Sequence, residues 1–194
     1  MIIVRLMLIF ILSIQSLSAE DYLSEIQKRL TKADIVLGQF EQQKQLKFLQ
    51  KPLISKGSFI YQNQRGLLWK TTSPLVSSLL ITPKHIYNQQ GAQAIPDSFG
   101  RLLPALLAAD WQQLAADFEI KATQQGQNWK LILLPKPALL AKAISQILIQ
   151  GDTNLNSLEI TETTGNSSLI NFTEISYPAQ LSTEQISEFE SLSP

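Results

Sequence analysis

Few residues of this chain have side chains that could carry out acid–base or nucleophilic chemistry. His85 is the only histidine and there is no cysteine, so metal sites built from several His or Cys ligands are excluded. A Ser-His-Asp arrangement would have to use His85, which lies in a strand-like segment, and no Gly-x-Ser-x-Gly turn accompanies it. We therefore interpret His85 as a solvated strand residue.

Three aspartates, Asp97, Asp110 and Asp117, lie near the ends of predicted helices. Carboxylates are stabilised by the positive end of a helix dipole, which favours helix capping over acid–base catalysis at these positions. The chain also has no phosphate-binding loop and no dinucleotide-binding fingerprint. The sequence thus predicts a protein that is not an enzyme and that uses no cofactor and no metal.

What the chain offers instead is apolar surface on segments with strand periodicity. Between residues 36 and 82, apolar and polar side chains alternate, so that alternate residues share one face of a sheet. In the first of these segments the alternation runs on to Phe48. Each apolar residue taken alone is interpreted as ordinary core, but as a set they predict a hydrophobic binding wall, made of Phe40, Phe59, Tyr61, Leu67, Trp69, Leu79 and Ile81.

The elements that carry this wall are predicted to be antiparallel strands. Short turns such as residues 63–66 separate them, and a parallel crossover needs about a dozen residues or more. Further strands are predicted near residues 118–123, 129–134, 144–150, 158–163 and 169–177. The predicted fold is therefore mainly β (α+β), an antiparallel sheet of roughly ten strands in which those between residues 36 and 87 form a meander.

A helix is predicted to interrupt the strands after Pro96, capped by Asp97 or Ser98. Pro104 predicts a kink or a new helix start within it, because proline lacks the backbone donor. Other short helices are predicted after Asp21 as N-cap, at residues 137–141 and at 183–189. The helical spacing places five apolar residues on one face, expected to cover the sheet: Phe99, Leu102, Leu103, Leu106 and Leu107.

The first residues have the composition of a secretory signal peptide. Met1–Arg5 is a basic start, Leu6–Ile14 is an apolar run, and Ser16–Ala19 offers small residues for cleavage. A membrane-spanning helix needs about 20 apolar residues, and this run is shorter. We expect Met1–Ala19 to be removed, with an uncleaved anchor as the alternative, leaving residues 20–194 as one exported domain.

Charge and cysteine content exclude several partners. The formal net charge is +0, which argues against nucleic acid and against tight electrostatic docking on anionic membranes. Without cysteine, lipid attachment at a cysteine is impossible, and no disulfide can stabilise the domain.

Several short motifs, in order along nearly the whole exported part, resemble the LolA-like periplasmic lipoprotein carriers. In that family an antiparallel, unclosed half β-barrel, here expected to have about ten or eleven strands, is lidded by about three short helices, and the cavity between them holds acyl chains. Lacking cysteine, the chain resembles the soluble carrier type rather than its lipid-anchored receptor. The motifs are Gly38–Gln42, Pro52–Leu53, Gly57–Phe59, Gly66–Pro74, Asp110–Trp111, Gly126–Leu131 and Pro135–Lys136.

One motif departs from the family pattern. An Arg-Pro-Gly-Arg-Phe-x-Trp run is common before the central Trp69, and its first Arg is tied to the lid. Here that position is Asn63, and Arg65 is displaced by two residues. The chain is also similar to divergent LolA-like proteins of lipid or polyene export, so a glycolipid or an acylated pigment is an alternative cargo.

The resemblance implies a monomeric periplasmic carrier that takes an acylated lipoprotein or lipid from an inner-membrane exporter to an outer-membrane acceptor. Burying each CH₂ is worth about 0.8 kcal/mol, so a long acyl chain gains on the order of 10 kcal/mol by leaving water. A carrier must offset most of this and still release its load. Two alternatives are a protein-binding module that uses an exposed strand edge and a hydrolase of lipid or glycan.

Overall fold

The computed structural model describes residues 19–30, 32–94 and 97–192. The predicted signal peptide therefore lies, apart from Ala19, outside the described residues. Within these ranges no helix has both the length and the apolar character needed to cross a bilayer.

Eleven strands form a single antiparallel sheet, which confirms the predicted fold class. Strands that follow one another in the chain pair with each other, except β6 and β7, which form the two edges of the sheet. The first and last strands, β1 and β11, also pair with each other. The predicted meander of the strands between residues 36 and 87 is confirmed, and a second meander, β7 to β11, joins it at the β1–β11 pair. The strands are β1 (Ile35–Gln45), β2 (Leu53–Gln62), β3 (Gly66–Ser73), β4 (Ser77–Ile81), β5 (His85–Asn88), β6 (Gly91–Ala94), β7 (Phe118–Gln125), β8 (Asn128–Pro135), β9 (Ile144–Gly151), β10 (Leu155–Glu162) and β11 (Ser167–Ser176).

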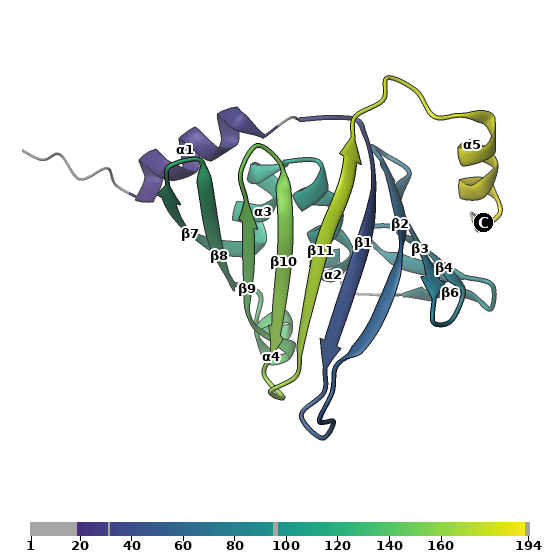
Figure 1. Cartoon of the computed structure of the whole chain (residues 1–194), viewed down its shortest axis with the longest axis horizontal. Helices are drawn as coiled ribbons and strands as arrows, with labels where there is room; N and C mark the ends of the chain where they lie inside the picture. The colour runs from purple at the N-terminus through teal and green to yellow at the C-terminus, as the bar shows by residue number, and fades with distance from the viewer. Residues whose placement is uncertain (1–18, 31, 95–96, 193–194) are drawn as a thin grey trace, which may run out of the picture.

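The helices explain why the barrel stays open. The described helices are α1 (Ala19–Arg29), α2 (Asp97–Leu107), α3 (Trp111–Asp117), α4 (Ala138–Ala143) and α5 (Thr183–Glu190). Helices α2 and α3 occupy the chain between the two edge strands and lie on one side of the curved sheet (Figure 1). The segment that leaves the barrel unclosed is therefore the segment that covers its interior.

Two helix starts differ from the prediction. Helix α1 begins at Ala19, so Asp21 lies inside its first turn and is not the N-cap. Helix α2 runs through Pro104 without a new start, and Ala108 still donates to the Pro104 carbonyl at 2.9 Å. Burial of Leu102 and Ala105 on either side offsets the donor that proline lacks, because packing of an apolar face outweighs local helix preference.

Helices pack on both faces of the sheet, although on the convex face they cover only one part of it. The concave face packs against α2 and α3, and the convex face of β2 to β4 packs against α5. A capping box at Ser182 starts α5, and the Lys70 ammonium pairs with the Glu188 carboxylate. The smaller convex core consists of Ile35, Ile60, Leu68, Leu80, Leu181 and Phe189.

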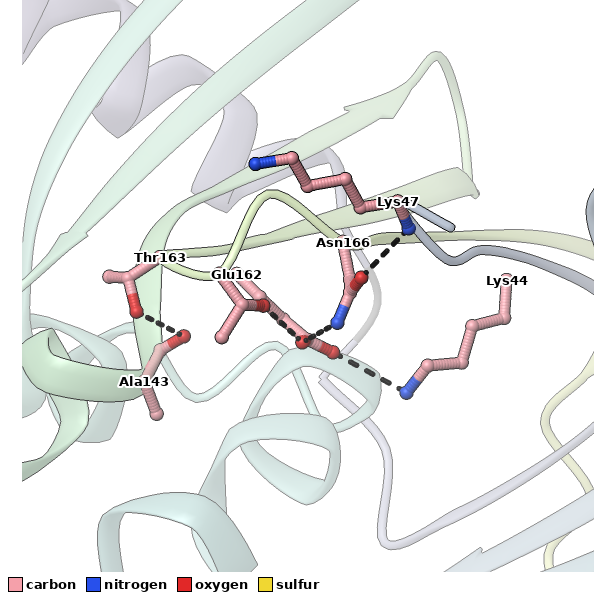
Figure 2. A network of polar contacts seen from close by, with 7 residues as sticks. Lys44, Lys47, Ala143, Glu162, Thr163 and Asn166 are labelled. Atoms are coloured by element: carbon pink, nitrogen blue, oxygen red, sulfur yellow. Dashed lines mark hydrogen bonds and ion pairs between the residues drawn. The ribbon is translucent and has the colours of Figure 1, made fainter. Parts of the chain in front are cut away.

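A polar network fixes the lower end of the sheet as drawn in Figure 1, where the β10–β11 turn meets β1 and α4. Asn166 Nδ2 donates to Glu162 Oε2 at 2.8 Å, and its Oδ1 accepts from the Lys47 backbone N–H at 3.0 Å (Figure 2). Lys44 Nζ lies 3.4 Å from Glu162 Oε1. Thr163 N–H donates to the Ala143 carbonyl at 3.0 Å, which attaches the end of α4.

This network predicts a pH-dependent contribution to stability. The Asn166 amide and, less strongly, the Thr164 hydroxyl and Lys44 charge hold the pKa of Glu162 below its usual value. A carboxyl group whose pKa is lower in the folded than in the unfolded state stabilises the fold at neutral pH. This stabilisation is lost as the pH falls from about 4.3, the pKa in the unfolded state, through the pKa in the folded state. We expect Glu162→Gln to lower the free energy of unfolding at pH 7 by less than about 1 kcal/mol. Urea unfolding at neutral and acid pH measures this, and a difference that does not shrink in acid would contradict it.

Candidate functional site

The wall of the interior is a stack of aromatic rings. The rings of Phe40 and Trp69 lie 3.8 Å apart at an interplanar angle of 23°. Phe59 lies 6.1 Å from Trp69, and its edge meets Phe172 at 5.6 Å. The stack requires Gly57, which pairs with Phe40, because a Cβ at Gly57 would lie 2.9 Å from the Phe40 ring and 1.8 Å from a β3 carbonyl oxygen.

The other predicted wall residues share this face. Leu67 pairs with Tyr61 on β2 and with Ile81 on β4, and Trp69 pairs with Leu79. Tyr61 and Leu67 are buried, while Leu79 and Ile81 are half-buried against the same core. Burial, reinforced by the charges of Asp110 and Asp34, raises the pKa of the Tyr61 hydroxyl, so it stays neutral.

The leucines of α2 face this wall. Leu102, Leu106 and Leu107 are buried, and Leu103 is half-buried against the same core. The side chain of Phe99 lies outside the described residues. Gly100 lets the helix backbone approach the β4–β5 turn, since a Cβ there would lie 2.3 Å from the Thr82 carbonyl oxygen. The cover is therefore seated by close backbone contact as well as by leucine packing.

An ion pair links the two covering helices. Arg101 Nη2 and Nε lie 3.0 and 3.3 Å from Asp117 Oδ2, and only 8% of Asp117 is exposed. The predicted capping role of Asp117 is wrong, because it ends α3, where the helix dipole is negative and Arg101 supplies the compensating charge. Asp110 does cap α3, accepting from the Gln113 N–H at 3.0 Å. The side chain of Asp97 lies outside the described part.

A small hollow remains under the cover. The space open to the centre of a water-sized sphere is about 20 Å³. A single water needs roughly 10–15 Å³, so the hollow has room for about one water. Its apolar lining comes from the residue that follows α1, the start of β1, the cover and the β8–β11 half of the sheet. It includes Leu30, Leu106, Leu107, Trp111, Trp129 and Tyr177.

The hollow and the predicted site overlap only in part. Of the eleven predicted residues, only Leu106 and Leu107 line it, and the rest pack beside it in the same core. Trp129, fixed by its Nε1 donating to the Asp152 carbonyl at 2.7 Å, was not predicted to lie in the site. Neither was Trp111, whose Nε1 is buried with no acceptor among the described residues. Both tryptophans lie in motifs that resemble the LolA-like carriers, and this resemblance is the sequence signal that could have identified them.

A second depression of about 260 Å³ lies beside the cover, and its lining, which is more apolar than polar, includes Tyr61, Asn63 and Arg101. Asn63 Nδ2 donates to Asp34 Oδ1 at 3.0 Å, so it ties the β2–β3 turn to the start of β1 and not to the helices. Arg65 is exposed in that turn. Neither Asn63 nor Arg65 forms the ion pair of the cover. That pair joins Arg101 of α2 to Asp117 of α3.

An unclosed antiparallel barrel with an apolar concave face and a helical cover defines the class of protein. A family model described as "Outer membrane lipoprotein carrier protein LolA" matches residues 31–187. The chain therefore belongs to the LolA family. Among curated proteins, no sequence relative matches the chain.

Solved structures with similar folds have low sequence identity to this chain. A LolA superfamily protein, NE2245, from Nitrosomonas europaea is 9% identical, with a TM-score of 0.48, over 87% of this chain and 97% of that one. A putative outer membrane lipoprotein-sorting protein domain from Vibrio parahaemolyticus is 11% identical, with a TM-score of 0.47, over 90% and 98%. MucA/MucB of Pseudomonas aeruginosa is 12% identical, with a TM-score of 0.47, over 87% and 60%.

Proposed function

We propose that this protein is a non-catalytic carrier that encloses an acyl chain between its aromatic wall and the leucines of α2. The observation that supports this most directly is the cover itself. An apolar helix occupies the concave side of an open barrel, and the remaining hollow holds about one water. Acyl binding therefore requires the cover to move and exchanges its contacts for contacts with the cargo.

This exchange accounts for binding that is reversible. The long acyl chain gains on the order of 10 kcal/mol by leaving water, but the wall loses its contacts with Leu102, Leu106 and Leu107 when the cover opens. The two terms oppose each other, so the net affinity stays moderate and the cargo can be released. The buried Nε1 of Trp111 offers a donor for the ester or amide carbonyl that joins an acyl chain to its carrier molecule.

The shuttle role extends this proposal. With Met1–Ala19 removed, the carrier works as a monomer in the periplasm, taking an acylated lipoprotein or lipid from an inner-membrane exporter to an outer-membrane acceptor. The family supports a lipoprotein cargo. Asn63 holds β1 instead of the helices, so this cover depends on its own Arg101–Asp117 pair and its leucines.

Leu103→Glu is expected to weaken uptake of a fluorescent fatty-acyl probe about tenfold while the sheet stays folded. Leu103 is half-buried, so the new carboxylate can turn to water, but the apolar contact of one leucine with the acyl chain, worth about 1.5 kcal/mol or more, is lost. Probe titration measures affinity, and far-UV circular dichroism checks the sheet. Leu139→Glu, at an exposed position of α4, is the matched control. Equal uptake by both variants would contradict the proposed role of the cover.

A further inference from the structure

All the strongly exposed large hydrophobic side chains of the described residues lie at one end of the molecule. Strand β1 runs down to its hairpin with β2 at the lower end in Figure 1, and α4 lies toward the same end. Strand β3 pairs antiparallel with β2 and so runs in the same direction as β1 to its turn with β4. The residues are Phe48, Leu53 and Ile54 of the first hairpin, Leu75 and Val76 of the second, and Leu139 of α4. Phe48, Leu75 and Val76 are each about four-fifths exposed, at 79%, 79% and 84%.

We call this end the apolar rim and define it as residues 41–57, 73–77, 138–143 and 162–166. The backbone register joins its parts: Lys56 pairs with Ser73, which sets the β3–β4 turn beside Leu53 and Ile54. The polar network of Figure 2 joins the β1–β2 hairpin to the β10–β11 turn and to α4. The rim is thus one surface held by fixed contacts.

The rim is also basic, although the whole chain is neutral. It contains five lysines and two glutamates, a surplus of three positive charges. Lys44 and Lys56 pair with Glu162 and Glu41, while Lys47, Lys51 and Lys142 are exposed. The remainder of the chain therefore carries the balancing negative charge.

We propose that the apolar rim docks on the surface of an anionic phospholipid membrane. Apolar side chains that project beside lysines match the two parts of a lipid interface, the acyl boundary and the phosphate headgroups. Phe48 stands directly next to Lys47, and the β1–β2 hairpin that carries both projects beyond the other strands (Figure 1). Charge favours a lipid surface over a second copy of the chain, because two such rims would repel each other.

This inference does not rest on the proposed acyl carrier function. The hollow lies near the opposite end, lined by the start of β1 and the residue that follows α1, so rim variants leave it intact. Membrane docking and acyl binding can therefore be measured separately in the same protein.

The test is flotation of the full exported chain with vesicles of phosphatidylethanolamine and phosphatidylglycerol at a ratio of about 3:1. Each lysine near such a surface strengthens binding about fivefold, so the double variant Lys47→Gln/Lys51→Gln is expected to bind at least about tenfold more weakly. Phe48→Ser should also weaken binding, and raising the ionic strength from about 0.05 to about 0.5 M should release the wild type. The matched control Lys28→Gln/Lys32→Gln removes the same charge at the opposite end and should bind like the wild type.

Binding that is equal on phosphatidylcholine vesicles, absent from both kinds of vesicle, or lost equally in the control variant would overturn the proposal. Light scattering without vesicles tests the second-copy alternative. A wild-type dimer that Phe48→Ser converts to a monomer would assign the rim to self-association and also overturn membrane docking. Far-UV circular dichroism that stays unchanged in the rim variants verifies that they are folded.

Discussion

Gly100→Val is expected to increase the affinity for a fluorescent fatty-acyl probe by roughly 5- to 150-fold. The added Cβ would lie 2.3 Å from the Thr82 carbonyl oxygen and 2.5 Å from that of Pro83, and both are backbone atoms that cannot rotate away. Overpacking of this kind costs about 1–3 kcal/mol. Because this cost falls on the closed arrangement alone, the variant shifts the population toward the open one. The apparent dissociation constant falls as the competent fraction rises.

Whether the probe affinity of Gly100→Val rises or falls distinguishes movement of the cover from unfolding of α2. A variant that merely unfolds α2 would lose the leucine contacts and bind no better, whereas one that lifts an intact α2 binds more tightly. Ala116→Val is the matched control, because it adds bulk at an exposed position of α3. Probe titration, with circular dichroism as the check on folding, decides between them. Weaker binding by a folded Gly100→Val protein would mean that the cover does not gate the interior.

Strand and helix periodicity was enough to predict the antiparallel sheet and the covering helix. Parity alone placed Phe59, Tyr61, Leu67 and Trp69 on one face, because the side-chain period in a strand is fixed at two. The pairing of β1 with β11 could not be predicted in this way, since it joins segments far apart in the chain without a turn to mark it. That pairing joins the predicted meander before α2 to the strands that follow α3.

The lining of the hollow was less predictable for a related reason. Leu30, Trp129 and Tyr177 come from three distant elements, and only the closure of the curved sheet brings them together. Phe48, in contrast, was predicted to lie on the apolar face of a strand but does not. Its alternation with polar neighbours predicted a strand residue on the apolar side, but β1 ends at Gln45, and the hairpin that follows leaves Phe48 79% exposed. Periodicity cannot show where a strand stops when no glycine or proline marks the end.

Gly57→Val is expected to lower the free energy of unfolding by about 3 kcal/mol or more. At Gly57 the strands β2 and β3 approach so closely that a Cβ would lie 1.8 Å from the Lys70 carbonyl oxygen and 2.9 Å from the Phe40 ring. The first contact is with backbone, so relief requires β2 and β3 to separate where their register already shifts, between Lys56 and Gly57. For a domain of this size each kcal/mol lowers Tm by roughly 2–4 °C, so the melting temperature should fall by about 6 °C or more.

The same substitution should disturb the aromatic wall, because Phe40 stacks on Trp69 directly beside the added side chain. Loss of near-UV circular dichroism below the unfolding transition would report this. Ser58→Val is the matched control: it places the same side chain on the neighbouring residue of β2, on the opposite face, and β-branched residues suit strands. Thermal unfolding of both variants compares them. If Gly57→Val were as stable as Ser58→Val, the close approach of β2 and β3, and with it the position of Phe40 in the wall, would be wrong.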